Sequence, residues 1–312
     1  MNNPAAPALE ALRPEFPLGI AYSGGADSSV LLRAAAKTWP GHVVALHVHH
    51  GLQAAAGDFV RHCEGVCAEL GVPLHVSRVQ AAHASGESPE DAARKARYTA
   101  LAQLCKEHAI RNVALAQHAD DQVETMLLAL SRGAGVPGLA AMPERFERHG
   151  VTFLRPLLGV SALAIRNWLR ESGHGFIDDP SNADTAFTRN KIRHTLLPAL
   201  GQAFPQFRET FGRSARNAAQ AQELLEELAA RDLQDTGNPP RIEPLRQLAR
   251  ARQANALRHW LRSAHGLAPS AAQLEELLDQ LEACSTRGHR IDIKVANGFL
   301  RREGEALAWY NR

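Results

Sequence analysis

The chain has 312 residues, which is enough for about two domains. Its composition, 45% hydrophobic and 22% charged, is that of a soluble globular protein, and the formal net charge is only +2. That small charge excludes a whole-chain attraction to nucleic acid, so any such attraction must come from local basic segments. No apolar run approaches the roughly 20 residues of a membrane span. Residues 1–14 lack the basic and hydrophobic regions of a secretory signal.

The four cysteines are few and scattered through the chain. Cys63 and Cys67 lie four residues apart on a predicted helix, and no second pair accompanies them. We therefore interpret them as reduced thiols of the core, which predicts a cytoplasmic protein.

A strand-to-helix turn is the most informative stretch of the sequence. The apolar residues 18–22 lead into Ser23-Gly24-Gly25-Ala26-Asp27-Ser28, and a helical run follows. Adjacent glycines let the backbone approach a ligand closely, and the N–H groups of a first helical turn favour an anion. Asp27 suits either Mg²⁺ or helix capping. The turn predicts a phosphate-binding loop without the Lys of the G-x-x-x-x-G-K-[ST] motif, and an ordinary Gly-Gly turn is the plainer alternative.

Strand and helix patterns alternate through the first half of the chain. Buried strands are expected over 18–23, 43–50, 74–79, 112–118 and 153–157, and helices over 28–37, 58–70, 89–108 and 121–130. This alternation predicts a doubly wound, mostly parallel α/β sheet. Ligands bind such sheets at the carboxyl ends of the strands, which is where Ser23, His50 and His118 fall.

The second strand ends in His47-Val48-His49-His50. Alternation along a strand places His47 and His49 on one face and His50 on the other. No Cys or carboxylate nearby completes a ligand set. We expect this strand end to form a wall beside a nucleotide rather than a metal site.

Two helical segments carry further candidates. Arg94, Arg97 and Tyr98 share one face of the helix over 89–108, which is either a solvated charged face or part of a site. Asp120, Asp121 and Glu124 follow the fourth strand, where three carboxylates suit metal or amine binding. The pair Asp121 and Glu124 also fits a capping box. Arg132-Gly133 opens the glycine-rich loop after this helix.

The organisation changes after residue 156. Between residues 187 and 217 there are six Lys or Arg and one acid, Glu209. A connector helix over 213–234 follows, and the helical stretch 241–262 carries six arginines against Glu243 alone. A helix over 270–284 and short strands over 290–295 and 299–302, joined at Asn297-Gly298, complete a small, mostly helical α+β domain. We place the domain division after residue 212.

Taken together, these motifs resemble the tRNA(Ile)-lysidine synthetase family, whose phosphate loop is the PP-loop of the N-type ATP pyrophosphatases. The resemblance covers about the first 200 residues in order and rests on the following motifs: Ser23-Gly24-Gly25-Ala26-Asp27-Ser28, His49-His50-Gly51-Leu52, Ala93-Arg94-x-x-Arg97-Tyr98, His118-Ala119-Asp120-Asp121-Gln122-x-Glu124-Thr125, Arg132-Gly133-x-Gly135, Asp179-x-Ser181-Asn182 and Arg189-Asn190-x-x-Arg193. The C-terminal third matches less by motif than by size and position.

The resemblance implies an ATP-dependent ligase in two steps. The C2 oxygen of the wobble cytidine of an isoleucine tRNA with a CAU anticodon attacks the α-phosphate of ATP, and free L-lysine then displaces AMP through its ε-amine. The product, lysidine, changes decoding from AUG to AUA. Many members of the family continue into a third domain, so the grip on the rest of the tRNA is open, as is the oligomeric state, for which we consider a homodimer.

The resemblance also assigns roles by residue. It implies catalysis by Asp27, Arg97, Asp121 and Glu124, with a tentative Mg²⁺ on Asp27 and the lysine on Asp121 and Glu124, either of which serves as base. ATP contacts are implied for Ser23, Gly24, Gly25, Ala26, Asp27, Ser28, His50, His118, Arg132 and Gly133. tRNA contacts are implied for Arg94, Arg189, Asn190, Arg193, Arg246 and Arg250.

Three other functions fit the sequence less well. A tRNA 2-thiocytidine sulfur transferase shares the loop, but the spacing of Cys63 and Cys67 lacks the paired C-x-x-C of its relatives. An amide-forming synthetase of the GMP-synthetase kind needs an ammonia source for which no extra domain fits. A nucleotide-sensing module without chemistry would not need the acidic and arginine motifs.

Overall fold

The computed structural model describes residues 2–49, 56–79, 89–178, 184–284, 290–296 and 298–311. His50 and the segment 179–183 with its Asp-x-Ser-Asn motif lie outside the described residues. The chain divides into two compact units, residues 1–219 and 220–312, and the division falls within helix α10 (Phe207–Thr236). The division that we placed after residue 212 lies in the same helix.

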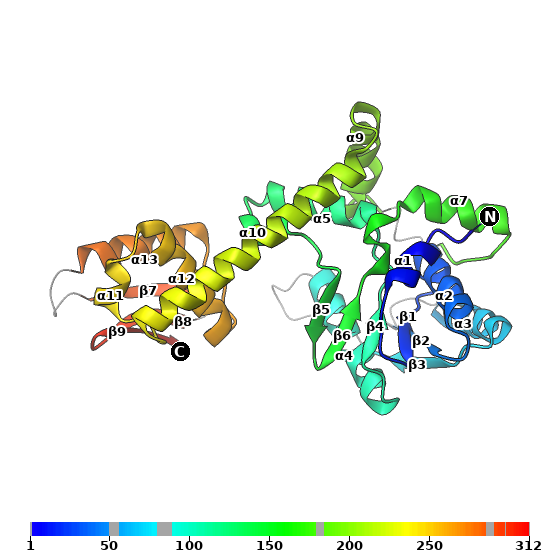
Figure 1. The fold of residues 1–312 in the computed structure, drawn as a ribbon, viewed down its shortest axis with the longest axis horizontal. Helices are drawn as coiled ribbons and strands as arrows, with labels where there is room; N and C mark the ends of the chain where they lie inside the picture. The colour runs from blue at the N-terminus through cyan, green and yellow to red at the C-terminus, as the bar shows by residue number, and fades with distance from the viewer. Residues whose placement is uncertain are drawn as a thin grey trace. The chain divides into compact units, whose positions relative to one another are not determined.

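The first unit is built on a six-stranded sheet of order β3-β2-β1-β4-β6-β5 (Figure 1). The strands are β1 (Leu18–Ala21), β2 (Val43–His49), β3 (Leu74–Arg78), β4 (Asn112–Ala114), β5 (Arg145–Arg148) and β6 (Val151–Leu154). Every neighbouring pair is parallel except β5 with β6. The predicted doubly wound, mostly parallel sheet is thus confirmed. The sequence did not predict β5, which pairs through a two-residue turn with positive φ at His149 and Gly150, the backbone of a hairpin.

Helices cover both faces of this sheet. They are α1 (Ala6–Ala11), α2 (Ala26–Thr38), α3 (Ala56–Leu70), α4 (Pro89–Glu107), α5 (Ala119–Ser131), α6 (Val136–Leu139) and α7 (Ala162–Ser172), with a 3₁₀ turn, η1 (Pro156–Gly159). Buried side chains of α1, α2, α3 and α7 form one core cluster with β1, and α4 supplies the cluster on the opposite face. The phosphate-loop candidate therefore sits where β1 leaves a sheet that is packed on both sides.

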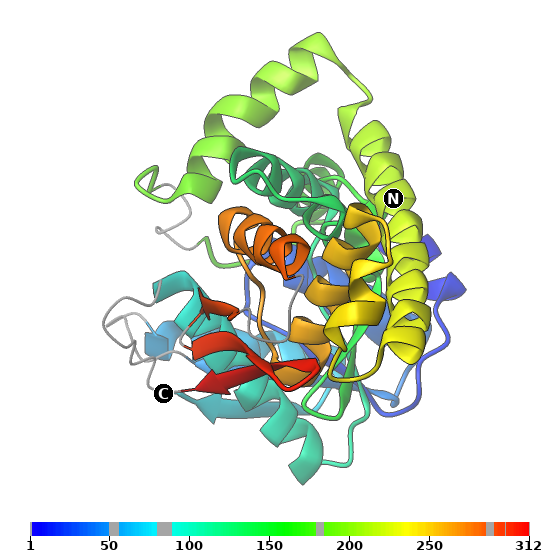
Figure 2. The same ribbon diagram turned by 90° about the vertical axis from the view of Figure 1, so that its left-hand side faces the viewer.

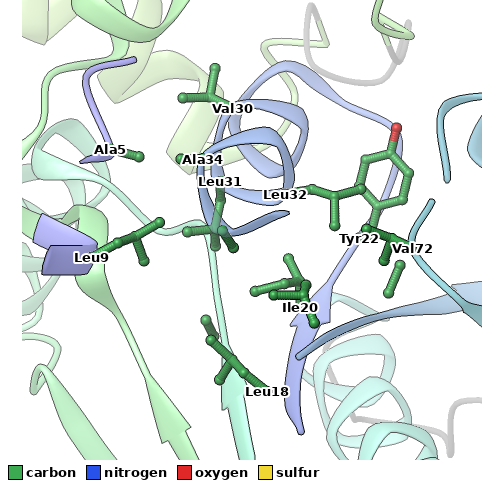
Figure 3. Packing of buried hydrophobic residues seen from close by; sticks show 14 of the residues in the cluster. Ala5, Leu9, Leu18, Ile20, Tyr22, Val30, Leu31, Leu32, Ala34 and Val72 are labelled. Carbon is green, nitrogen blue, oxygen red and sulfur yellow. The ribbon is translucent and has the colours of Figure 1, made fainter. Parts of the chain in front are cut away.

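Strand β1 shows how its sequence fits this place. Leu18, Ile20 and Tyr22 alternate with smaller residues and are buried against α2 (Figure 3). On the other face Gly19 leaves no room for a side chain, because a Cβ there would lie 2.9 Å from Leu46 Cδ1. The small apolar run before the loop is thus set by close strand packing.

A helical arm follows α7. It consists of α8 (Thr188–Lys191), a π-helical turn η3 (Ile192–Leu196) and α9 (Leu197–Ala203), after which the chain turns into α10. In Figures 1 and 2 α9 stands out from the sheet of the first unit before the chain turns back. Ile192, Leu197 and Phe207 bury against Val123 and Leu128 of α5, so the arm is anchored on that helix.

The second unit packs three helices beside a three-stranded antiparallel sheet of order β7-β8-β9 (Figure 2). The elements are α11 (Ile242–Arg246), α12 (Arg250–His265), α13 (Ala271–Ala283), β7 (Asp292–Val295), β8 (Gly298–Glu303) and β9 (Ala306–Asn311). The small α+β domain is as predicted, but the single helix expected over 241–262 is two helices. The Gln253 side chain donates to Leu248 O at 2.7 Å, which satisfies a carbonyl freed by the break. Strand β9 was not expected.

No helix among the described residues is long and apolar enough to cross a membrane.

Candidate active site

The loop between β1 and α2 is shaped by its own hydroxyl groups. Ser23 Oγ and Ser28 Oγ lie 3.0 Å apart, and Ser28 Oγ donates to Gly25 O at 3.1 Å. Gly25 is the N-cap of α2 and has no side chain to bond the first helical turn. The N–H groups of that turn therefore point away from the helix, which is the arrangement that binds an anion.

Gly24 is required at its position for two reasons. Its φ of +86° lies in the region that favours glycine. A Cβ there would also lie 3.2 Å from Cys63 Sγ. Its carbonyl accepts from Ile177 N at 2.9 Å, so the segment before residue 179 lies against the loop.

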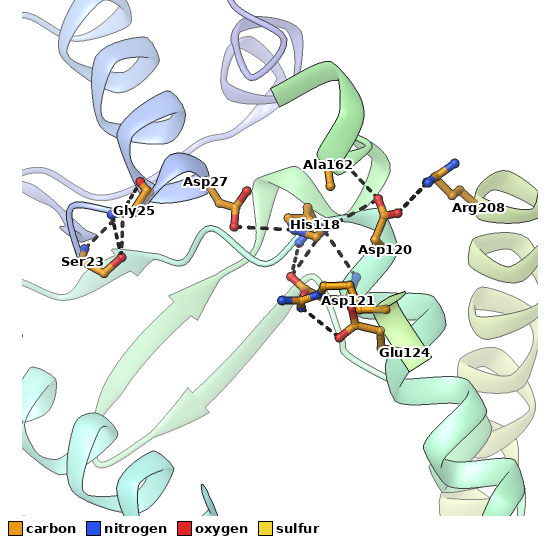
Figure 4. Close-up of polar contacts among 11 residues, drawn as sticks. Ser23, Gly25, Asp27, His118, Asp120, Asp121, Glu124, Ala162 and Arg208 are labelled. Atoms are coloured by element: carbon orange, nitrogen blue, oxygen red, sulfur yellow. Dashed lines mark hydrogen bonds and ion pairs between the residues drawn. The ribbon is translucent and has the colours of Figure 1, made fainter. Parts of the chain in front are cut away.

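His118 joins the loop to the acidic segment (Figure 4). Its Nε2 lies 3.6 Å from Asp27 Oδ2, and its Nδ1 lies 3.5 Å from Asp121 Oδ2 and 3.9 Å from Asp120 Oδ2. Burial opposes a charge on the ring, but the carboxylates of Asp121, Asp27 and Asp120 outweigh it and raise the pKa of His118 to about 9. At neutral pH both ring nitrogens carry a proton. The protonated Nδ1 then donates to the Asp121 carboxylate. It has no lone pair to accept a hydrogen bond from the Asp121 backbone N–H, which lies 3.4 Å away.

Helix α5 begins at Ala119, whereas the sequence predicted a start at Asp121. We considered a capping box of Asp121 with Glu124, but the N-cap is His118, and the Asp121 side chain accepts from the His118 N–H at 3.0 Å. The physical reason is the extended backbone of His118, with φ −126° and ψ −177°, after which the backbone becomes helical. Glu124 therefore lies inside the helix and takes no part in capping.

Glu124 is fully buried and paired with Arg193. Arg193 Nε donates to Glu124 Oε1 at 2.7 Å, and Nη2 donates to Glu124 Oε2 at 3.1 Å and to Asp121 Oδ1 at 3.2 Å. Burial raises the pKa of Glu124, and Arg193 offsets part of that rise. Arg193 belongs to the π-helical turn η3, a kind of distortion that is frequent at functional sites.

Asp120 is held from two sides. Its Oδ1 accepts from Arg208 Nε at 2.8 Å, and its Oδ2 accepts from Ala162 N, at the start of α7, at 2.8 Å. Burial opposes ionisation, but Arg208 and the Ala162 N–H outweigh it and lower the pKa of Asp120. The ionised Asp120 thus fixes the starts of α5 and α7 to α10. Sequence reasoning named Asp120 only as one of three carboxylates and gave no signal for Arg208, which is distant in the chain.

The structure brings together part of the predicted set. Asp27, His118, Asp121, Glu124 and Arg193 form one connected network. Arg132 and Gly133 instead lie at the other end of α5, roughly 16 Å from Asp121 along the helix.

The predicted face of α4 is divided. Tyr98 is 4% exposed and packs edge-on against Phe153, whereas Arg94 and Arg97 are exposed. Arg94 Nη2 donates to Asp91 at 2.8 Å. Tyr98 thus serves the core, and the two arginines are the members of this motif that lie at the surface.

The predicted tRNA contacts differ in their surroundings. Asn190 is buried and its side chain donates to Asp184 O at 2.8 Å. In the second unit Arg246 donates to Glu243, and Arg250 lies 2.8 Å from Glu275 and 2.6 Å from Asp279. The positive charge of the 241–262 stretch is thus partly neutralised by acids from elsewhere in the chain.

The histidine and cysteine side chains near the site have structural surroundings. Among the described residues there is no group of three or more His, Cys, Asp or Glu that could hold a metal ion. His47 is buried and its Nδ1 bonds the carbonyl of Tyr22 at 2.8 Å. All four cysteines are buried and free, and burial raises the pKa of Cys63 to about 12 and that of Cys67 to about 11.

Several classes of nucleotide-binding protein have a strand-to-helix anion loop at the carboxyl edge of a parallel sheet, and the PP-loop class is one of them. The family model described as "PP-loop domain" matches residues 5–200, and the model described as "TilS substrate binding domain" matches residues 241–307. PP-loop proteins of this class use ATP.

Similar proteins show which family within the PP-loop class the chain belongs to. The chain is 60% identical to the tRNA(Ile)-lysidine synthase of Polaromonas naphthalenivorans over 98% of this chain and 95% of that protein. It is 42% identical to the protein of that name from Burkholderia pseudomallei over 97% of this chain but 63% of that protein. The chain belongs to the tRNA(Ile)-lysidine synthase family.

Solved structures share the fold. The U34-tRNA thiolase NcsA from Methanococcus maripaludis, a structure with its [4Fe-4S] cluster, superimposes with a TM-score of 0.59 over 69% of this chain and 76% of that one. At 14% identity this likeness shows the fold alone.

Proposed function

We propose that the chain joins free L-lysine to C2 of the wobble cytidine in an isoleucine tRNA with a CAU anticodon, in the cytoplasm. In the first step the C2 oxygen attacks the α-phosphorus of ATP, the bond between the α- and β-phosphates breaks, and pyrophosphate leaves. In the second step the ε-amine attacks C2, the C–O bond breaks, and AMP leaves with that oxygen. The carrying observation is the continuous polar network from Asp27 at the phosphate loop, through His118, to Asp121, Glu124 and Arg193.

The loop side of this network suits the first step. The N–H groups of the first α2 turn present donors to phosphate oxygens, and the Ser23 and Ser28 hydroxyls, which bond each other and Gly25 O, hold the loop in shape. His118, charged at neutral pH, lies behind Asp27 and adds a positive charge that the developing pyrophosphate requires.

Asp27 could hold a magnesium ion only when the phosphate oxygens of ATP supply further ligands. Its carboxylate is 42% exposed, and one carboxylate beside phosphate oxygens is a common donor set for Mg²⁺. When bound there, Mg²⁺ neutralises charge on the leaving pyrophosphate.

The acidic side suits the second step. A free lysine ammonium has a pKa near 10.4, so its deprotonation at pH 7 costs roughly 4–5 kcal/mol. A carboxylate that binds the ammonium and takes its proton lowers this barrier. Asp121 is 15% exposed, whereas Glu124 is fully buried beneath Arg193, which supports Asp121 as the group that meets the amine and Glu124 as its buried partner.

Basic residues supply the remaining contacts of the proposal. We expect Arg97, with Arg94 beside it, to steady the adenylated intermediate, and Arg189 to contact the tRNA backbone. The surroundings of Arg246 and Arg250 support a smaller share for them, because carboxylates already pair with both. The buried, weakly acidic thiols of Cys63 and Cys67 give no support to sulfur transfer.

The test is direct. Purified protein is incubated with ATP, labelled lysine and unmodified isoleucine tRNA, and the label is followed into the RNA. Lysine incorporation that requires ATP and the CAU anticodon is expected. No incorporation, or transfer of sulfur from a labelled donor instead, would overturn the proposal. A homodimer is tested in the same preparation by sedimentation velocity.

A further inference from the structure

The arm that carries Arg193 ends in an apolar cavity that the reaction scheme leaves unused. The cavity, about 580 Å³, lies where α9 turns into α10 and is lined mainly by Phe204, Pro205, Phe207 and Phe211. The cavity is a hollow in the surface that is wide open to solvent. Phe204 is 63% exposed, an unusual position for a large aromatic side chain beside such a cavity.

The floor of the cavity is fixed to the active site. Phe207 is 1% exposed and belongs to the cluster that also contains Val123 of α5, the neighbour of Glu124. Arg208 packs its guanidinium 4.4 Å from the Phe207 ring centre and bonds Asp120, the neighbour of Asp121. A ligand in this cavity would therefore rest on the elements that hold the catalytic carboxylates.

The side chains that line the cavity indicate which kind of ligand it suits. Its polar side chains, Gln206 and Thr210, are neutral, so the cavity suits a flat, uncharged group rather than a phosphate. At about 100° per residue on α10, Arg208 and Arg213 fall on either side of the cavity face and Glu209 falls on the far side of the helix. The charge of Arg208 is already paired with Asp120, whereas Arg213 is exposed. An aromatic floor with an exposed arginine beside it matches a nucleotide, with the base inside and the phosphate outside.

We propose that this cavity receives an unpaired nucleobase of the tRNA anticodon loop, stacked on Phe204, next to the cytidine that reacts. The proposal rests on the proposed function for the identity of the RNA. A second copy of the chain is the competing occupant, but a two-fold contact through this face would bring the Arg213 side chains of both copies together, which is unfavourable.

The first experiment measures tRNA affinity by fluorescence anisotropy at fixed salt. Loss of one stacking contact is expected to weaken binding about 5- to 100-fold. Phe204→Leu, which keeps apolar bulk but has no aromatic face, should show this loss, and Phe204→Trp should bind like the wild type. Leu224→Ala is the control, because Leu224 is an apolar side chain that is 67% exposed farther along the chain, on α10. The affinity for ATP should be unchanged in all three variants. Equal tRNA affinity of Phe204→Leu and the wild type would overturn the proposal.

The second experiment identifies the contacted base. An abasic nucleotide is placed in turn at each position of the anticodon loop, and both the wild type and Phe204→Leu are titrated. At one position the two proteins should bind equally, because the stacked base has been removed. Convergence at no position would overturn the proposal, as would a Phe204→Leu variant that loses only self-association in sedimentation velocity.

The two proposals can fail separately. Phe204-dependent binding of tRNA without lysine transfer would sink the proposed function and leave the base pocket standing. Lysine transfer by the wild type with unchanged binding by Phe204→Leu would sink the pocket alone.

Discussion

The buried pair of Glu124 and Arg193 gives a prediction whose size can be worked out from the structure. Glu124 has no solvent exposure, and Arg193 bonds both of its carboxylate oxygens, at 2.7 and 3.1 Å. Arg193→Met keeps most of the side-chain volume but leaves the carboxylate without its cation. Breaking one side of a buried pair costs about 3–5 kcal/mol. The double variant Glu124→Met/Arg193→Met removes both charges and should lie within about 1 kcal/mol of the wild type.

Peptide-resolved hydrogen exchange of α5 measures this cost in the unit that contains the pair. The sign of the pH dependence is fixed by Glu124, whose pKa burial already raises. Without Arg193 that pKa rises further, so the variant's defect should be large at pH 8 and shrink toward pH 5 as Glu124 takes up a proton. A defect of Arg193→Met below about 1 kcal/mol, or a double variant as unstable as the sum of the singles, would refute the reasoning.

Three further predictions concern the rest of the network. Because the pKa of His118 is raised to about 9, its charge stabilises the fold fully below about pH 6.5, and this contribution, at most about 3 kcal/mol, is lost as the pH rises through 9. The urea midpoint of the wild type should therefore fall over this pH range, and that of His118→Gln should not. Parallel pH dependence of the two urea midpoints would contradict the prediction. Asp121→Asn should abolish lysine transfer while calorimetry shows ATP binding retained, and full activity would return Asp121 to its capping role. Gly24→Ala should weaken ATP binding at least tenfold, because it adds strain at φ +86° and a contact at Cys63 Sγ; Gly150→Ala, at φ +75° with nothing within 4 Å, shares the strain and should bind ATP normally.

Much of the fold was predictable because it depends on local pattern. Apolar runs followed by amphipathic stretches gave the parallel strands and their helices, and a serine before a helix is a local cap signal of the kind seen at Ser161, which accepts from Ala164 N at 3.1 Å. The missed strand β5, Arg-Phe-Glu-Arg, alternates charged residues with a single phenylalanine, so no apolar run marks it. Strand β9, Ala-Leu-Ala-Trp-Tyr-Asn, is apolar in sequence, and its pattern was overlooked at the end of the chain. The break between α11 and α12 was missed because the carbonyl that it frees, Leu248 O, is bonded by a side chain several residues later, that of Gln253.

The site was predictable only as separate motifs. Each motif indicated its residue types, but which of them meet depends on tertiary contacts such as that of Arg193 with Glu124, 69 residues apart. The start of α5 shows the same limit on a smaller scale. Asp121 and Glu124 fit a capping pattern in the sequence, yet the helix begins at Ala119. Glu124 therefore lies within the helix, where its side chain is fully buried and its carboxylate needs a cation beside it.

The two basic stretches show why a count of charges is a poor guide to a binding surface. In the second unit the arginines of α12 meet acids supplied by α10 and α13: Arg250 alone faces Glu275, Asp279 and Glu282. An ion pair at the surface weakens the field that a phosphate would feel, since the partner carboxylate screens it at short range. In the 187–217 stretch Arg193 and Arg208 likewise pair with carboxylates of α5, whereas Arg213 is exposed beside the Phe204 cavity. The attraction of the arm for RNA is therefore expected from exposed arginines such as Arg213, and it is smaller than the count of six basic residues suggests.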